Sequence, residues 1–525
     1  MTTRTKAFRV IADPFVVAPP SGARIRTRIR PTEGEAAALT RVGQLLGVLS
    51  RRDLSQRLAL GVSGKGDLRA QRKQGLTSST SSRWAGAITR ASNDQYALGL
   101  RALFAERDSL SAAIAVLGKR TDAAAGACDV STRAKGYRDE HERFAKKRRL
   151  NGLRHRIAAV DQRIATARPR MVIGGNRLWR NRNRLEEANL TEPQWRDTWD
   201  ASRSFLTADG ESGKTLGNET IRLTLDGLLS IKVPAALVAE LGIGTHLRIA
   251  EPAVFAYRHA DWVDRVSAHQ AVRYDISFDA QTQRWYVDAS WKTPQVEHVP
   301  TVDQLRSQRH LGVDLNADHL AAVVVDSCGN PVGEPHTIPL ELAGLPATTR
   351  DARLRDAISH LLRIAKNNNC GAIAIEILGF VDARDTGRET MGRGKRRKTF
   401  RRTVAAIPTA KFRERLVAMA YRSGVWVVSV DPAYTSKWGN QHWTKPLQQQ
   451  TSTDTVTRHH GAAAAISRRS HGQPIRRRKP GLRTAQRSSA NHPASRPECN
   501  PVIVDVQHGP VSPAATKATG SSRQH

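Results

Sequence analysis

The sequence predicts a multidomain protein of the α/β plus β class, in which a helical segment interrupts the β part. Three patterns support this prediction: strands alternate with helices over residues 306–470, paired short strands fill about 205–291, and a helix near 135–167 carries a long apolar repeat. A chain of 525 residues is too long for a single compact core, so its length also indicates several domains.

The charge of the chain points to a polyanionic partner. Its 83 Lys and Arg against 48 Asp and Glu give a formal net charge of +35, while 39% apolar residues suffice for real cores. Such an excess of one sign opposes compaction, and nucleic acid is the simplest reason to keep it, because each neutralised phosphate releases counterions. The alternative, a basic background spread along the chain, is disfavoured because the positive residues cluster.

The cysteines and apolar segments limit the cellular setting. Four cysteines stand far apart without a CxxC pair, which disfavours a disulfide framework or a cysteine zinc site and fits a reducing cytoplasm. No segment approaches the roughly 20 apolar residues that span a bilayer, and the N-terminus lacks a signal-peptide core. We expect a cytoplasmic protein with no membrane partner.

The β part is expected to come from two separate stretches. Residues 1–60 hold alternating "ARIRTRIR" and then a helix that Thr32 opens with a capping box. Residues 201–300 hold hairpins, the first turning at Asp226-Gly227, which suggests a small barrel or sandwich. The second hairpin pairs strands at Tyr274–Phe278 and Trp285–Ala289.

Residues 61–200, between these stretches, are expected to form an inserted helical lobe. Its clearest helix presents a 3-4 repeat typical of a paired-helix seam. The seam residues are Leu150, Leu153, Ile157, Val160 and Ile164. Beside them, Arg148 and Arg149 are either a solvated face or contacts to a phosphate backbone.

The segment 306–470 is expected to be the α/β domain. The strand "HLGVDLN" leads into "LAAVVVDSCGNPVG", which turns at a Gly-Asn pair, and a helix follows. The strand "GAIAIE", a basic loop, a helix near Phe412 and the strand "GVWVVSV" complete it. Residues 471–525 are basic, rich in Pro and Ser and without period, which predicts a disordered tail.

Two acids in this domain are candidates for metal chemistry. Asp314 lies in the first strand and Glu376 ends a later one, and a carboxylate at the edge of a buried strand is costly unless it is paired or metal-bound. Singly, each is best explained as a turn residue or helix cap. Together, in the order strand–acid, hairpin, helix, strand–acid, they favour two carboxylates that share Mg²⁺ ions for phosphodiester cleavage.

At these residues the sequence resembles the TnpB (OrfB) family of transposon-encoded RNA-guided nucleases, which is related to type V CRISPR effectors. The resemblance rests on an ordered set of short motifs within 306–470, each weak by itself. The motifs are Gly312 to Asp314, Asp326 to Asn330, Glu376 to Leu378 and Pro432 to Ser436. It implies a RuvC-like (RNase H-fold) nuclease domain, preceded by a β-barrel wedge domain with an inserted helical recognition lobe.

The resemblance also implies roles and partners. Asp314 and Glu376 would be metal-binding acids for two Mg²⁺ ions, guide RNA would pair with a double-stranded DNA target, and the protein would act at the bacterial nucleoid. The basic loop after Glu376 would contact nucleic-acid backbone, although a solvated loop is the plainer explanation of any one side chain. Its candidate residues are Arg393, Lys395, Arg396, Arg397, Lys398, Arg401 and Arg402.

Two departures from the family pattern matter. Where the family carries a zinc ribbon, this chain has Gly439 and His442 in place of thiols, so we expect a degenerate ribbon without structural zinc, packed by Trp438 and Trp443 or simply holding them as ordinary core. The second departure concerns the third acid. Its aligned position falls on His459 or nearby, which leaves three candidates: His459, His460 and the upstream Asp454.

The sequence is therefore compatible with three functions. The first is a Mg²⁺-dependent, RNA-guided DNA endonuclease, with Asp314, Glu376, His459 and Asp454 as candidate catalytic residues. The second is an RNA-guided DNA-binding protein or repressor with impaired cleavage, which the missing third acid favours. The third is a transposase that binds the ends of its element directly. Oligomeric state is not predicted.

Overall fold

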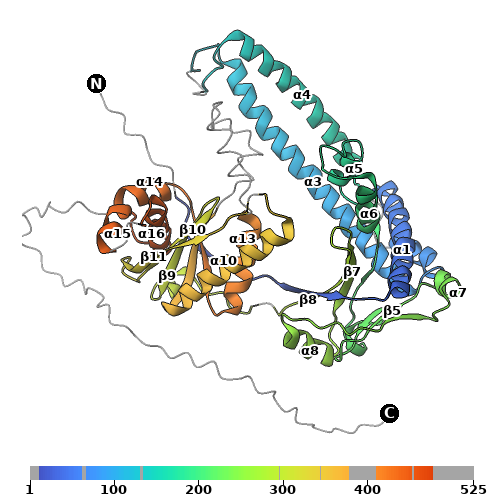
Figure 1. Cartoon of the computed structure of the whole chain (residues 1–525). Helices are drawn as coiled ribbons and strands as arrows, with labels where there is room; N and C mark the ends of the chain where they lie inside the picture. The colour runs from blue at the N-terminus through green and yellow to red at the C-terminus, as the bar shows by residue number, and fades with distance from the viewer. Residues whose placement is uncertain are drawn as a thin grey trace, which may run out of the picture.

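The computed structural model describes residues 11–61, 67–129, 134–294, 296–342, 344–377, 409–451 and 455–476. The chain forms a C-terminal α/β domain and an N-terminal part built of two small sheets and long helices, each with its own apolar core (Figure 1). The basic loop residues Arg393 to Arg402 and the candidate Asp454 lie outside the described residues.

The α/β domain is built on one six-stranded mixed sheet. Its order is β1-β13-β12-β9-β10-β11, with β10 antiparallel to both β9 and β11, and β12 parallel to both β9 and β13. The strands are β1 (Phe15–Val16), β9 (Arg309–Leu315), β10 (His319–Val325), β11 (Pro331–Pro339), β12 (Cys370–Glu376) and β13 (Trp426–Val430). The order strand, hairpin, helix, strand predicted from the sequence is confirmed.

Alternate side chains of the sheet face different helices. Leu311 and Val313 of β9 point to the face covered by α10 (Ala347–Asn367) and α13 (Thr409–Arg422), where the larger core lies. Figure 1 shows these two helices together on that side of the sheet. The opposite face is covered by α16 (Arg458–Ser470), whose Ala462 to Ala465 are all buried.

The helix α16 lies unusually close to the sheet at Gly312. A Cβ at this position would stand 2.1 Å from the carbonyl oxygen of Ala463 and 2.7 Å from the Cβ of Ser467. Ser467 also donates a hydrogen bond to the His310 carbonyl, which ties the same helix to β9. The glycine of the "LGVD" motif therefore sets how near α16 comes to the acidic residue two positions later.

We expect Gly312→Ala to destabilise the α/β domain by about 1–3 kcal/mol, because the added methyl group overpacks a rigid backbone contact. Thermal unfolding monitored by circular dichroism measures the effect. The matched control is Gly118→Ala in α3 (Ser82–Asp122), where an added Cβ meets nothing within 4 Å and alanine should raise stability slightly. Equal melting temperatures for both variants would contradict the packing argument.

The segment after β13 is helical where a degenerate zinc ribbon was expected. It forms α14 (Thr435–Gly439), a π-helical turn over 440–444 and α15 (Lys445–Gln450). Trp443 is buried and donates its indole N–H to the Ile475 carbonyl at 2.7 Å, and Trp438 packs at the edge of the same core. Ordinary core packing therefore accounts for both tryptophans.

Two short segments outside residues 306–470 pack with the α/β domain, which the sequence did not predict. The strand β1, expected with the N-terminal β part, pairs instead with β13, and Ala12 donates to the Asp431 carboxylate at 3.1 Å. At the other end, His471 stacks on His310 with 3.8 Å between ring centroids, so the prediction that the disordered tail begins at 471 is wrong at this residue. A two-residue strand and a stacked ring carry no periodic signal, so sequence patterns could not assign them.

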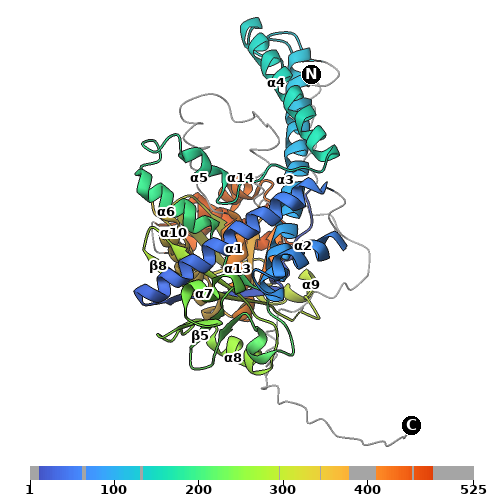
Figure 2. The same ribbon diagram turned by 90° about the vertical axis from the view of Figure 1, so that its right-hand side faces the viewer.

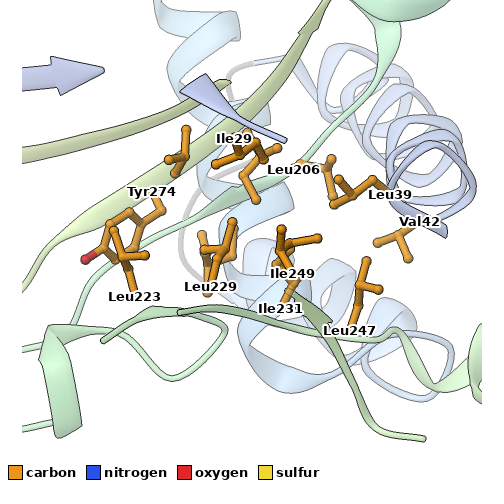
Figure 3. Packing of buried hydrophobic residues seen from close by; sticks show 14 of the residues in the cluster. Ile29, Leu39, Val42, Leu206, Leu223, Leu229, Ile231, Leu247, Ile249 and Tyr274 are labelled. Carbon is orange, nitrogen blue, oxygen red and sulfur yellow. The ribbon is translucent and has the colours of Figure 1, made fainter. Parts of the chain in front are cut away.

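The N-terminal part encloses one core between two antiparallel sheets, with orders β2-β8-β7-β3 and β4-β5-β6. Figure 3 shows Leu229, Ile231 and Ile249 of the smaller sheet facing Ile29 and Tyr274 of the larger one. The strands are β2 (Gly22–Ile29), β3 (Thr207–Ala208), β4 (Ile221–Leu223), β5 (Leu229–Lys232), β6 (His246–Ile249), β7 (Arg273–Asp279) and β8 (Arg284–Lys292). Both predicted hairpins are confirmed. Among the described residues no strand belongs to both sheets, so closure into a barrel is not shown.

The helices inserted between β2 and β3 form the long projecting lobe. α3 packs along α4 (Glu140–Ala165) as an antiparallel pair that extends away from the rest of the chain (Figure 1), and α1 and α2 flank its base (Figure 2). The remaining helices here are α1 (Glu33–Ala59), α2 (Asp67–Thr77), α5 (Asn176–Asn181) and α6 (Glu192–Arg203). The predicted seam is confirmed, because Val160 is fully buried between Leu103 and Leu110.

Shorter helices complete the chain. They are α7 (Val238–Leu241), α8 (His259–Ser267) and α9 (Val302–Leu305), with 3-10 turns at Thr215–Gly217 and Ala235–Leu237. The predicted capping box at Thr32 is confirmed, because its hydroxyl accepts from the Glu35 N–H while the Glu35 carboxylate accepts from the Thr32 N–H.

Candidate active site

Asp314 and Glu376 lie side by side on the face of the sheet that α16 covers. Val313 and Ile375 are direct partners in the parallel β9–β12 ladder, so the next residue of each strand stands in register about 4.8 Å away and points to the same face. The sequence left open whether these two acids meet, and the strand register brings them together.

The environment of Glu376 makes its negative charge costly. Burial at the end of β12 and the neighbouring charge of Asp314 raise the pKa of Glu376 to about 7, against its ordinary 4.5. The Thr435 hydroxyl contacts the carboxylate and acts in the opposite direction, as does the Arg469 guanidinium. Near neutral pH this side chain is therefore poised between its neutral and charged forms.

His459 contacts Asp314 directly. Its Nδ1 lies 2.9 Å from the Asp314 Oδ2, so the ring donates its Nδ1 proton to the carboxylate. Its Nε2 accepts from the Arg458 guanidinium at 3.4 Å, which agrees with that tautomer. Asp314 of β9 thus orients the ring of His459, which lies on α16, 145 residues further along the chain. In this tautomer the Nε2 of His459 is the hydrogen-bond acceptor.

The adjacent His460 has a different task. It is 2% exposed and its Nδ1 accepts the Thr457 N–H at 3.0 Å, which completes a capping box at the start of α16. Its Nε2 lies 3.0 Å from the Thr337 hydroxyl, and burial lowers its pKa. The sequence alone offered no basis for choosing between the two histidines. In the structure, His459 contacts Asp314 and His460 caps the start of α16.

Three further side chains near Asp314, those of Asn316, Asp318 and His319, were not predicted from the sequence. Asn316 donates to the Asp314 Oδ2 at 3.1 Å, and its amide also lies 3.4 Å from His319 Nε2. His319 is fixed by Asp318 at 2.7 Å and packs edge-on against His459, with 5.0 Å between ring centroids. The stretch "DLNADH" directly after the acid was the available signal, since it places amide, acid and imidazole groups in one tight turn.

A second group of polar residues, Asp431, Thr435 and Arg469, lies near the Glu376 carboxylate. Asp431, at the end of β13, is 2% exposed and accepts from the Ala433 N–H at 2.8 Å. Arg469 of α16 is buried beside it and donates to the Asp431 carbonyl oxygen. Thr435 owes its place to Tyr434, whose left-handed backbone (φ 66°) turns the chain into α14. The Pro-x-Tyr-Thr-Ser motif thus delivers a hydroxyl to Glu376.

The chemistry of the side chains at Asp314 and Glu376 fits Mg²⁺ in its ligand type. Two adjacent carboxylates, one of them destabilised as an anion by burial, supply the hard oxygen ligands that this ion prefers. Among the described ranges, however, no group of three or more His, Cys, Asp or Glu side chains is arranged to hold a metal ion. Asp314 and Glu376 supply two carboxylates at this place, and His459 contacts Asp314.

We expect Glu376 to make the metal-free protein less stable as the pH rises from about 4.5 to 7. The folded pKa lies above the unfolded one, so the folded state binds the extra proton in this window and loses about 3 kcal/mol of stability across it. Buried histidines such as His310, whose pKa falls to about 3, change stability in the opposite sense below pH 6.5. The informative quantity is therefore the difference between wild type and Glu376→Gln.

Urea unfolding of both proteins at pH 5, 6, 7 and 8, with and without Mg²⁺, measures that difference. Without metal, Glu376→Gln should gain stability over wild type as the pH rises. With Mg²⁺, wild type should be stabilised more at pH 8 than at pH 6, because the ion binds the deprotonated carboxylate. A wild type and a variant with parallel pH curves would show that Glu376 titrates normally.

Among the nucleic-acid candidates, Arg148 and Arg149 lie exposed on α4, and neither has an ion-pair partner in the described part of the chain. Their role as backbone contacts stays a prediction. No helix in the described ranges is long and apolar enough to cross a membrane.

Comparisons with known proteins place this chain near two kinds of solved structure, at low similarity. No family model matches it, and no curated protein matches it. A T. thermophilus RuvC in complex with a Holliday junction substrate is 16% identical, with a TM-score of 0.22, over 31% of this chain and 92% of that one. A second Thermus thermophilus RuvC structure is 17% identical, with a TM-score of 0.20, and covers 31% of this chain and 92% of that one.

A Cas12f1–sgRNA–target DNA complex covers more of the molecule. It is 10% identical, with a TM-score of 0.32, over 85% of this chain and 98% of that chain. With TM-scores this low, the likenesses carry no weight for function. What the site can do rests on its own side chains.

Proposed function

We propose that this protein is a divalent-metal-dependent nuclease of the RuvC type that cleaves nucleic-acid phosphodiester bonds. The single observation that carries the proposal is the pair Asp314 and Glu376, in register on neighbouring parallel strands, with the pKa of Glu376 raised to about 7. A buried pair of like charges destabilises the fold, so its natural explanation is a cation that both residues hold. The order of the strands, hairpin first and parallel pair second, is that of the RNase H fold.

Each side chain of the site has a defined part in this proposal. Mg²⁺, when bound by Asp314 and Glu376, would supply charge stabilisation for the phosphate and an activated water. His459, held by Asp314 with Nε2 as acceptor, takes a proton from a nearby water or orients it. Thr435 fixes the Glu376 carboxylate, and Arg469 supplies a permanent positive charge beside it.

The finer proposal is an RNA-guided DNA endonuclease of the TnpB type, encoded by a transposable element. It is supported by the ordered motifs of the α/β domain, by the formal net charge of +35, and by a helical lobe inserted into a β part. In this proposal the partners are a guide RNA and a double-stranded DNA target, and sequence is read by base pairing while the protein contacts backbone and helix shape.

The test is cleavage by the full chain purified with its co-expressed RNA. Supercoiled DNA that carries sequences complementary to the bound RNA is incubated with Mg²⁺, with Ca²⁺ or with EDTA. The nuclease proposal expects nicked or linear DNA with Mg²⁺ and none with EDTA, and the RNA-guided form expects loss of cleavage when complementarity is removed. Cleavage in EDTA would overturn the metal proposal, whereas Mg²⁺-dependent cleavage without complementarity would overturn only the guide.

One observation favours a second candidate, an RNA-guided DNA-binding protein with impaired cleavage. At the position aligned with the family's third acid this chain has His459. This residue is hydrogen-bonded to Asp314 and does not supply a third carboxylate. Binding of the same DNA in gel-shift assays without any cleavage at high Mg²⁺ would favour this candidate. Direct binding of element ends without RNA would favour a transposase instead.

A further inference from the structure

The short helix α5 carries an exposed aromatic side chain among arginines. Trp179 is 48% exposed, which is unusual for the residue that buries the largest apolar area. Four exposed arginines occur within eight residues of sequence around it: Arg177, Arg180, Arg182 and Arg184. We call Trp179 with Arg177, Arg180 and Arg182 the α5 surface.

The α5 surface is held rigidly although the helix is short. The Leu178 carbonyl accepts the indole N–H of Trp195 at 2.8 Å, which fixes α5 on α6. A Cβ at Gly174 would stand 2.9 Å from the Trp199 ring, so the chain enters α5 pressed against α6 as well. Trp195 and Trp199 stack at 5.6 Å and form the support. The indole of Trp179 is therefore presented outward by a fixed backbone.

The arginines that flank Trp179 in the sequence are largely without an acid partner among the described residues. Arg182 follows Trp179 by three residues in helical conformation, which places the two side chains on one face. Within the described ranges only Arg184 pairs with an acid, at 3.6 Å from Glu187, while Arg177, Arg180 and Arg182 have no carboxylate partner. An apolar protein partner would leave these charges desolvated, whereas a polyanion would neutralise them.

We propose that the α5 surface binds an unpaired segment of nucleic acid, with one base stacked on Trp179 and the flanking phosphates on Arg177, Arg180 and Arg182. A flat indole accepts the face of any base, and the arginines supply backbone contacts without sequence preference. α5 lies against α6 at the base of the α3–α4 pair, within the helical lobe (Figure 1). This binding is independent of the cleavage proposed above, because no residue of the α5 surface belongs to the active site.

The experiment separates stacking from charge. The full chain in EDTA is titrated with fluorescent single-stranded oligonucleotides, once with all bases and once with an abasic residue at successive positions, in RNA and DNA forms. Wild type should bind the intact strand about tenfold more tightly than the best-placed abasic strand. Trp179→Ala should lose that difference, Trp179→Phe should keep part of it, and Arg180→Gln should weaken both strands and lower the salt slope by about 1.

A matched control is Leu225→Ala, an equally exposed apolar side chain (50%) in the turn between β4 and β5, which should bind like wild type. Thermal unfolding of Trp179→Ala checks that the fold is kept. The proposal is overturned if Trp179→Ala weakens intact and abasic strands equally, or leaves both unchanged. The RNA and DNA arms decide which strand is the occupant. Cleavage that survives in Trp179→Ala leaves the nuclease proposal standing on its own evidence.

Discussion

Asp314→Asn and Glu376→Gln are each expected to reduce Mg²⁺-dependent cleavage by about 100- to 1000-fold or more, while nucleic-acid binding is kept. Each variant removes one anionic oxygen from the only pair of carboxylates that the register of β9 and β12 brings together on the α16 face. The amides have the same shape, so strand packing should survive. Single-turnover cleavage rates at saturating enzyme measure the loss directly, without contributions from product release.

The control and the binding assay make this prediction specific. Asp356→Asn changes an exposed acid on α10, which covers the opposite face of the sheet, and should cleave like wild type. Gel-shift affinity of Asp314→Asn should match that of wild type in EDTA. If either active-site variant retains more than about a tenth of the wild-type rate, the two carboxylates do not hold the catalytic metal and the proposed site is wrong.

His459→Ala is expected to slow cleavage by about 100-fold or more, because the ring that Asp314 orients supplies proton transfer or water positioning. The neighbouring His460 provides an internal control, since His460→Gln keeps a residue that can complete the capping box at Thr457. That variant should keep its cleavage rate within a few-fold. Rates across a pH series measure whether the loss in His459→Ala involves a titrating group.

His459→Asp separates the nuclease from the impaired binding protein. In a working enzyme that uses the imidazole, the aspartate should not exceed the wild-type rate. In a protein whose cleavage is weak for lack of a third acid, the aspartate should raise cleavage above wild type, while His459→Ala should change nothing. The second pattern would replace the proposed function with the binding candidate.

Much of the secondary structure of this long chain follows from short-range sequence patterns. The apolar strands of the α/β domain, the seam of α4 and the turn at Asp226-Gly227 could all be predicted, because each depends on neighbours within a few residues. The order of elements made Asp314 and Glu376 candidates for one site, and the register of β9 and β12 brought them together. The seven basic residues from Arg393 to Arg402 and Asp454 stay predictions, as they lie outside the described residues.

Only the tertiary structure determined the contacts between residues that are far apart in the chain. His459 reaches Asp314 across 145 residues, Thr435 reaches Glu376 across 59, and Ala12 reaches Asp431 across 419. None of these leaves a periodic trace in the sequence, because the partner of a side chain depends on which helix covers which face of the sheet. The sequence by itself determined the longer helices and strands and the two candidate acids, whose patterns are short-range, but not the strand β1 or the helical segment after β13. The packing of α16 over Gly312 determined which histidine contacts Asp314, since only close approach of helix and sheet brings the His459 Nδ1 to the carboxylate.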